Sequence, residues 1–281
     1  MEIVDSQLHM NLLAAPGTPD DQVIDQTLAA MVAVGVDKLL IVEATTAVPR
    51  PEEVLPNGTV RRDFRLSKRT VERFPETFRW VGRVDYDDAD VQGQVARLKH
   101  EGAVALRVVP LPDSPAVAAF EQGAFEALFA AAQQHALPVF TWLPGRTHLL
   151  PRYLRQFPDL TFILDHAGTF FEPLPEPPAR YGELAAVCEL AAFPNLAVKW
   201  CHGPERVSVE ACPYRDLQPY LRRMLDAFTP QRVMWASDYI PKRYPVSWAQ
   251  SLYHVLTWNE LSDAAAEWFF GRTLRTLLPW S

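Results

Sequence analysis

Two side chains that can bind a metal ion, a water or a substrate oxygen stand two positions apart near the start of the chain. They are Gln7 and His9, in the segment VDSQLHM of residues 4–10. Two histidines at this spacing would form half of a metal site. A neutral amide is a poor ligand for a borderline-soft ion such as zinc, so Gln7 weakens that half-site. The segment leaves open one weakly held metal or none, and its meaning depends on what lies nearby.

Chemically capable residues also end the later apolar runs. These residues are Glu43, Arg83 and Asp85, Arg107, Thr141 and Trp142, Asp165 and His166, Lys199 and His202, and Ser237 and Asp238. Glu43 is as well suited to capping the following helix as to chemistry. The remaining histidines, at positions 100, 135, 148 and 254, lie in helical patterns or at loop edges, and we treat them as structural.

The elements that must position these groups alternate between short apolar runs and amphipathic stretches. The pattern predicts eight strands, at 2–8, 38–42, 79–84, 103–108, 138–142, 161–164, 196–200 and 232–236. It predicts helices at 20–34, 66–74, 89–100, 120–135, 148–157, 181–193, 214–228 and 245–256, and a last one near 262–271. Eight β-then-α units favour a distorted (β/α)8 TIM barrel, with one domain over residues 1–281 and an extra C-terminal helix. An open doubly wound sheet would need a Gly-rich phosphate loop, which the sequence lacks.

In such a barrel the strand ends meet at one face, where the catalytic groups belong. Gln7 and His9 share a parity along their strand, so both are predicted to project into the same mouth. Lys199 and His202 have opposite parity, so at most one of them points inward without a bulge. The long loop at 49–63 and the Pro-rich stretch at 172–180 are candidate lids.

Composition narrows the classes of partner. A formal net charge of -7 and the absence of long Lys/Arg runs argue against nucleic-acid or membrane binding. The 3 cysteines fit no C-x-x-C pattern, which argues against a disulfide framework or a thiolate zinc site. With no leader-like N-terminus and no long apolar run, we expect a cytoplasmic protein. Homo-oligomerisation stays open.

Several segments, in order, resemble the landmarks of a known family. They are VDSQLHM, GAVALRVVP, LPVFTW, LTFILDHAG, NLAVKW and RVMWASDYIP, of which LDHAG and MWASDYIP are the most specific. Together they resemble the amidohydrolase-related (amidohydrolase 2 type) TIM-barrel hydrolases of the amidohydrolase superfamily, including lactonases similar to 2-pyrone-4,6-dicarboxylate hydrolase. The resemblance covers nearly the whole chain. It implies hydrolysis of a cyclic ester, amide or related bond or, in some branches, removal of a carboxyl group.

Residue by residue, the resemblance assigns His9 to the second histidine of the family's H-x-H pair. It assigns His166 and Asp238 to the histidine and aspartate after the sixth and eighth strands, and Arg107 to an arginine that faces an acidic substrate. Two positions depart from the family. Gln7 replaces the first histidine, and Trp142 stands where metal-binding members often carry another.

Two mechanisms follow. His9, His166 and Asp238 can complete a three-ligand site for one divalent ion, Zn or Mn, with Gln7 behind them. Alternatively, without metal, Asp238 activates a water while His9, His166 and Gln7 polarise the substrate carbonyl.

The substrate is expected to be a small anionic molecule. Arg107 would bind its carboxylate. Arg83, Lys199 and His202 would make the mouth positive, or Arg83 would instead pair with Asp85. Trp142 and Tyr239 would provide an apolar wall. We therefore predict a lactonase-like hydrolase. A metal-dependent decarboxylase of a small aromatic or unsaturated acid, or a barrel that binds a small acid without turnover, are the alternatives.

Overall fold

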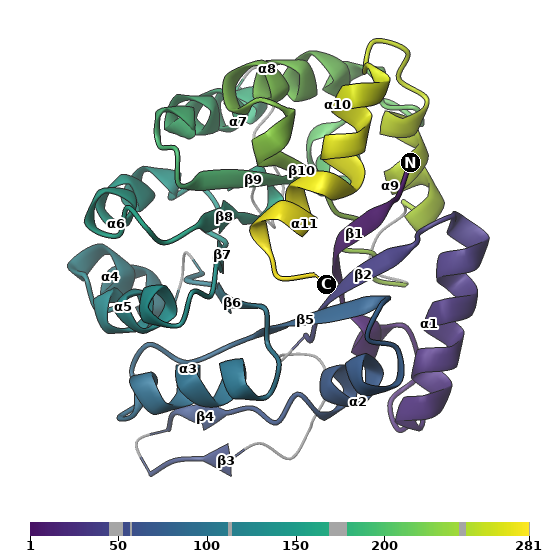
Figure 1. Cartoon of the computed structure of the whole chain (residues 1–281). Helices are drawn as coiled ribbons and strands as arrows, with labels where there is room; N and C mark the ends of the chain where they lie inside the picture. Colours follow the sequence, from purple (N-terminus) through teal and green to yellow (C-terminus); the bar gives the residue numbers. More distant parts are fainter. Residues whose placement is uncertain (45–52, 57, 112–113, 169–178, 242–245, 281) are drawn as a thin grey trace.

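Eight parallel strands wind into a nearly closed barrel in the computed structural model, which describes residues 1–44, 53–56, 58–111, 114–168, 179–241 and 246–280 (Figure 1). Their order is β1 (Val4–Leu8), β2 (Lys38–Val42), β5 (Phe78–Gly82), β6 (Ala105–Val108), β7 (Val139–Thr141), β8 (Phe162–Leu164), β9 (Leu196–Trp200) and β10 (Val233–Trp235). Each strand pairs in parallel with the next one along the chain that belongs to the sheet, from β1 to β10. The predicted (β/α)8 fold is confirmed.

The seam between β1 and β10 is closed by hydrogen bonds that include side chains. Ser6 Oγ donates to the Trp235 carbonyl at 2.6 Å, and the Asp238 amide donates to the Gln7 carbonyl at 3.0 Å. The pairing of β1 with β2 shifts register between Asp5 and Leu8. This irregularity lies in the strand that carries Gln7.

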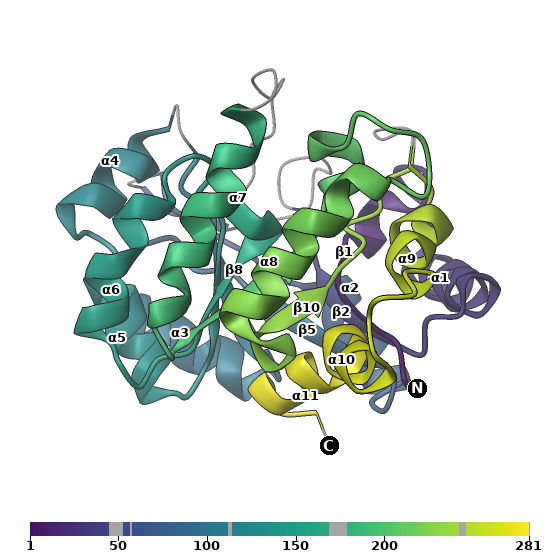
Figure 2. The same ribbon diagram turned by 90° about the horizontal axis from the view of Figure 1, so that it is seen from above.

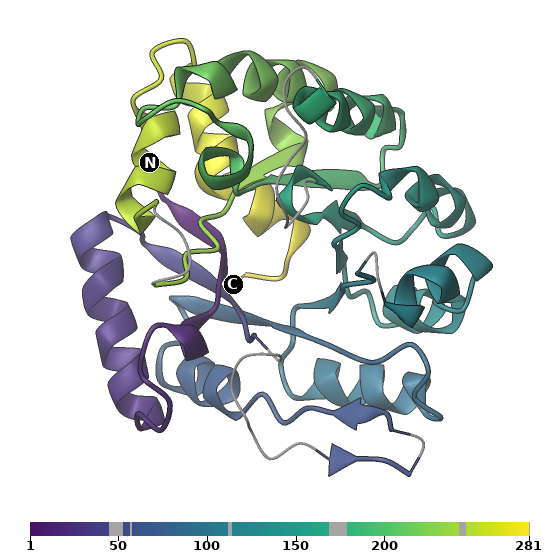
Figure 3. The ribbon, with the colours of Figure 1, turned by 180° about the vertical axis from the view of Figure 1, so that it is seen from behind.

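The helices surround the barrel (Figures 1 and 3). They are α1 (Asp20–Val34), α2 (Arg65–Arg73), α3 (Val91–His100), α4 (Pro115–Gln122), α5 (Glu126–Gln134), α6 (Leu150–Gln156), α7 (Ala179–Glu189), α8 (Gln218–Phe228) and α9 (Trp248–Leu256). The helix expected at 120–135 is two helices in the structure. The first starts at Pro115 and ends because Gly123 adopts a left-handed conformation with φ of 95°.

Alternation along the strands sorts the apolar side chains into two cores. Leu39 and Ile41 pack outward against the helices, whereas Leu40 and Val42 face the barrel interior. The interior core also contains residues of the C-terminal segment, namely Leu274, Leu278 and Trp280.

The C-terminal segment closes the end of the barrel opposite the carboxyl ends of the strands (Figure 2). It consists of α10 (Asp263–Glu267), a π-helical turn (Trp268–Arg272) and α11 (Thr273–Leu277). The last helix predicted near 262–271 is therefore confirmed, although it extends to Leu277.

The loop predicted at 49–63 contains a short antiparallel hairpin, β3 (Glu53–Val54) with β4 (Val60–Arg61). Two-residue strands leave too little alternation to be detected from the sequence. The other candidate lid, at 172–180, lies outside the described residues except for the start of α7. Over the part of the chain that the structure describes, no helix has the length and apolar character to cross a bilayer.

Candidate active site

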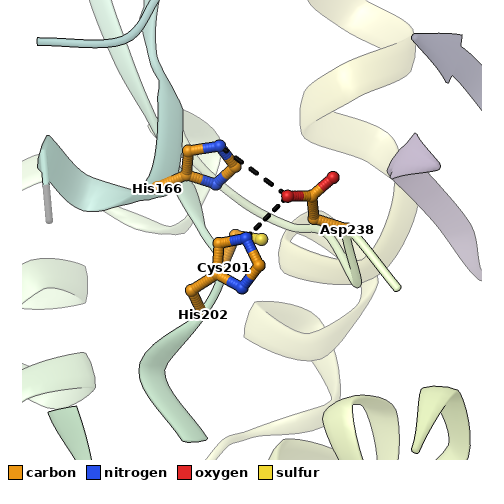
Figure 4. A group of neighbouring side chains, drawn as sticks. All are labelled: His166, Cys201, His202 and Asp238. Atoms are coloured by element: carbon orange, nitrogen blue, oxygen red, sulfur yellow. Dashed lines mark hydrogen bonds and ion pairs between the residues drawn. The ribbon is translucent and has the colours of Figure 1, made fainter. Parts of the chain in front are cut away.

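Asp238 is the centre of a cluster of polar side chains at the carboxyl ends of the strands. Its Oδ1 lies 2.8 Å from Gln7 Nε2 and 2.9 Å from His9 Nε2. Its Oδ2 lies 2.6 Å from His202 Nε2 and 3.9 Å from His166 Nε2 (Figure 4). The structure thus brings together all four predicted catalytic residues, Gln7, His9, His166 and Asp238, and adds a third imidazole.

Three of these residues adopt backbone conformations that L-amino acids rarely use. The φ angles are 54° at His166, 58° at His202 and 44° at Asp238. Each follows a strand directly or within a few residues, so the chain turns sharply there and aims its side chain at the common centre. A left-handed conformation costs about 1 to 2 kcal/mol per residue and persists where its surroundings enforce it. Asp238 and the two histidines beside it all have this conformation, and such a cluster is typical of a functional site.

His9 is held by its second ring nitrogen. Nδ1 lies 2.5 Å from the Val42 carbonyl, which only accepts hydrogen bonds, so Nδ1 carries a proton. Nε2 then carries no proton, so two acceptors, His9 Nε2 and Asp238 Oδ1, face each other at 2.9 Å. A proton or a metal ion between these two atoms would make the contact favourable. An imidazole anchored to a backbone carbonyl in this way is also the common arrangement of a metal-binding histidine.

A chain of buried charges lies beneath Asp238. Lys199 Nζ donates to Gln7 Oε1 and to Asp165 Oδ1, both at 2.7 Å, and lies 4.1 Å from the centroid of the Phe140 ring. Asp165 Oδ2 accepts from Arg107 Nε at 2.6 Å. Because Lys199 must donate, the carbonyl end of the Gln7 amide faces Lys199 and the NH₂ end faces Asp238.

The charges in this chain compensate one another. Burial alone would raise the pKa of Asp165, but Lys199 and Arg107 outweigh it and hold that pKa below its usual range. Burial lowers the pKa of Lys199, and Asp165 opposes the shift. The Lys199 side chain is fully buried, beneath the site rather than at its mouth.

His202 is the site residue that sequence reasoning missed as a direct partner of Asp238. Alternation along the strand predicts that only one of Lys199 and His202 points inward, but β9 ends at Trp200 and the left-handed turn at His202 breaks the alternation. Burial opposes a charge on His202, yet Asp238 and Glu205 outweigh it and raise its pKa to about 9. Glu205 Oε2 lies 3.6 Å from His202 Nδ1. The only signal in the sequence is the position of His202 just after a strand.

His166 is packed between polar and aromatic groups. Arg107 Nη2 lies 3.2 Å from His166 Nε2, and since a guanidinium only donates, this nitrogen accepts. Trp142 packs edge-on against the His166 ring at 5.2 Å between centroids. Burial, and then the nearby His202, lower the pKa of His166 well below its usual value, so its ring is neutral at pH 7.

Asp238 itself is held as an anion. Burial would raise its pKa, but His9 and His202 outweigh burial and hold the pKa well below its usual range. Asp5 supports this arrangement from behind, since its carboxylate accepts hydrogen bonds from the amides of Gln7 and Ser237 and from Trp248 Nε1. These bonds fix the backbone on both sides of the seam.

Three residues singled out from the sequence, Arg83, Tyr239 and Glu43, have neighbours other than the cluster described above. Arg83 follows β5, is half-buried and lies 3.9 Å from Asp85. Tyr239, next to Asp238, is half-buried and stacks on Trp248 at 6.1 Å between centroids. Glu43 Oε1 accepts from the amide and the hydroxyl of Ser67 at 2.9 and 2.7 Å, so it caps the start of α2.

The donor atoms around Asp238 fit one divalent ion. His166, Cys201, His202 and Asp238 offer ligand atoms that all lie within 4.8 Å of one another, and all four residues are buried. Imidazole, carboxylate and thiol donors suit zinc better than a hard cation. The prediction of at most one divalent metal agrees with this geometry.

The fold is that of a TIM-barrel protein whose cluster of polar side chains lies at the carboxyl ends of the strands. The family model described as amidohydrolase matches residues 5–280, and the chain belongs to the amidohydrolase family. The prediction from the strand-end motifs is confirmed at this level.

The chain is also similar to individual known proteins. The chain is 29% identical to an L-fucono-1,5-lactonase from Burkholderia ambifaria over 168 residues, which are 57% of this chain and 54% of that protein, so it matches about half the length of this curated relative. An amidohydrolase from Burkholderia multivorans with bound zinc has a TM-score of 0.73 and 21% identity, and the alignment covers 99% of this chain and 100% of that one. A Pseudomonas putida protein assigned to the 2-pyrone-4,6-dicarboxylic acid hydrolases has a TM-score of 0.70 and 18% identity, with 98% and 97% covered. At these identities the two solved structures establish the fold.

Proposed function

We propose that this protein hydrolyses a lactone, or a related cyclic ester or amide, that carries a carboxylate. The observation that supports this most is the set of contacts to Asp238, a buried anion surrounded by three imidazoles. Such a group can take a proton from water while the imidazole of His202, which donates from Nε2, stabilises the oxyanion that forms on the substrate. The name of the Burkholderia ambifaria relative, an L-fucono-1,5-lactonase, supports opening of a lactone ring, and the carboxylate is proposed from Arg107.

Asp238 is a weak base as long as its donors hold it, because the same contacts that keep it ionised lower its proton affinity. We infer that the substrate carbonyl recruits one donor, His202, as negative charge develops on its oxygen. Oδ2 of Asp238 is then free to accept the proton of the attacking water. Collapse of the tetrahedral intermediate expels the ring oxygen, which takes that proton and leaves the product as a hydroxy acid.

Gln7 and Lys199 act as positioning residues in this proposal. Lys199 fixes the orientation of the Gln7 amide, and Gln7 fixes Oδ1 of Asp238. This role replaces direct contact of Lys199 with the substrate, because the side chain is fully buried. Arg107 remains the candidate for the substrate carboxylate, although Asp165 and His166 already engage its Nε and Nη2.

A divalent ion would be held by Asp238 and His166 together with a second imidazole, that of His202, since the ligand atoms of these residues lie within 4.8 Å of one another. When bound, it would polarise the carbonyl and make a water more acidic. The residues around it would still orient the substrate and exclude bulk water.

The test is a panel of neutral and carboxylated lactones, with phenolic acids added, assayed on chelator-treated and zinc-loaded protein. Ring opening is followed by proton release, and decarboxylation by CO₂ release. The proposal expects ring opening of carboxylated lactones. CO₂ release alone would favour the decarboxylase alternative, and a melting-temperature shift without turnover would favour a binding protein.

A further inference from the structure

Cys201 also belongs to the site, although the sequence did not predict a role for it there. It lies between β9 and His202, is buried, and its sulfur belongs to the group of four ligand atoms within 4.8 Å of one another. Figure 4 shows it beside His202, with His166 and Asp238 facing the same space. Consecutive side chains on a strand point to opposite faces, but the turn at His202, with φ of 58°, brings both side chains to one centre.

The two oxygens of Asp238 face different surroundings. Oδ1 receives the N–H of Gln7, whose orientation is fixed because its Oε1 accepts from Lys199 Nζ. A cation beside Oδ1 would therefore meet an N–H group and, behind it, a buried ammonium. Oδ2 instead faces the imidazoles of His202 and His166. Oδ1 also faces His9 Nε2 at 2.9 Å, but the four ligand atoms within 4.8 Å of one another gather beside His202 and His166, so the Oδ2 side favours a cation more than the Oδ1 side does.

We propose that His166, Cys201, His202 and Asp238 bind one thiophilic divalent ion, and that His9 stays outside the coordination sphere. The inference rests on the proposed function insofar as this ion would share Asp238 with the hydrolytic site. Loss of the first histidine of the H-x-H pair at Gln7 is then compensated on the opposite side of the carboxylate. A ligand set that includes Cys201 also replaces the expectation from the sequence that no cysteine binds a metal ion.

The chemistry of the set favours zinc or cobalt over Mn²⁺ or Mg²⁺, because a thiolate and two imidazoles are soft or borderline ligands. In a tetrahedral zinc site, ligand atoms about 2.0 to 2.3 Å from the ion are roughly 3.3 to 3.8 Å apart. The present limit of 4.8 Å requires only a modest contraction of the cluster. Binding would release the thiol proton of Cys201 and the proton that His202 donates to Asp238.

The test uses full-length protein in which Cys188 and Cys212 are replaced by serine, so that Cys201 is the only cysteine left. After chelation and reloading, metal analysis is expected to give one zinc per chain. X-ray absorption on the zinc form should show a sulfur neighbour at about 2.3 Å. The cobalt form should show the intense near-ultraviolet thiolate-to-cobalt band, and Cys201→Ser should abolish it.

His9→Asn is the discriminating control, since it removes the competing ligand on the Oδ1 side. The proposal expects this variant to retain the ion and the cobalt band. A zinc shell of nitrogen and oxygen alone, loss of metal in His9→Asn with retention in Cys201→Ser, or no metal retained at all would overturn it. The X-ray absorption readout needs no change at Cys201, so misfolding of Cys201→Ser cannot obscure the result.

The outcome is separable from that of the proposed function. Lactone hydrolysis by a protein without a sulfur ligand would overturn this inference and leave the function intact. A sulfur-ligated ion in a protein that opens no lactone would support this inference and overturn the proposed function.

Discussion

Gln7 donates its side-chain amide to Oδ1 of Asp238 at 2.8 Å, across the seam where the first and last strands of the barrel meet. The other end of the same amide accepts from Lys199 Nζ at 2.7 Å. A neutral side chain thus separates a buried ammonium from a buried carboxylate and satisfies both. A metal-ligating histidine at this position would have to give up one of these two contacts in order to bind an ion.

Gln7→Glu tests this bridging role with almost no change of shape. The new carboxylate still accepts from Lys199 but places an oxygen, rather than an N–H, against Asp238. We expect the free energy of unfolding to fall by about 1 to 3 kcal/mol, measured by urea denaturation. Gln92→Glu, at an exposed position of α3, is the matched control and should change it by less than about 0.5 kcal/mol. Equal stability of Gln7→Glu and wild type would contradict the bridging role.

Lys199→Met removes the charge that Asp165 and Gln7 share. Asp165 would keep Arg107 but lose its fully buried partner, so we expect a loss of about 3 to 5 kcal/mol of stability. Lys68→Met breaks the more exposed pairs with Asp63 and Glu101 and should cost no more than about 1 kcal/mol. If the two variants lose similar stability, the buried chain of charges is not what holds the site.

The pKa of His202 predicts how stability depends on pH in the metal-free protein. The folded-state pKa of about 9 lies above the ordinary value of 6.5, so the stabilisation is fully present below pH 6.5 and is lost as pH rises through about 9. This difference corresponds to about 3 kcal/mol as an order of magnitude. Denaturation of chelator-treated protein between pH 6 and 10 should show the decline, and His202→Asn should flatten it. If the decline in stability is unchanged in His202→Asn, another titrating group causes it.

Arg107→Lys tests recognition of the substrate carboxylate. Lysine keeps a positive charge near Asp165 but loses the planar set of donors, so KM for a carboxylated lactone should rise about tenfold or more. KM for a neutral lactone should stay near the wild-type value. A parallel rise for both substrates would mean that Arg107 acts through Asp165 and His166 instead.

The sequence predicted the barrel and the convergence of Gln7, His9, His166 and Asp238, because both depend on local patterns. Apolar runs and helical periods are local, and His9, His166 and Asp238 follow strands whose carboxyl ends must converge. The contact of His202 with Asp238 and the place of Cys201 in the site were not predicted, because alternation applies only while a strand continues, and β9 ends at Trp200. The burial of Lys199 depends on the partners Gln7 and Asp165, which come from other strands and which no local pattern reveals.

The central claim is that Asp238 accepts the proton of the attacking water, and Asp238→Asn tests it most directly. The measurement is kcat/KM for a carboxylated lactone that the wild type opens, with equal melting temperatures as the check on folding. We expect a loss of about 10² to 10⁴-fold, the usual contribution of a positioned base. A folded Asp238→Asn protein with undiminished kcat/KM would contradict it.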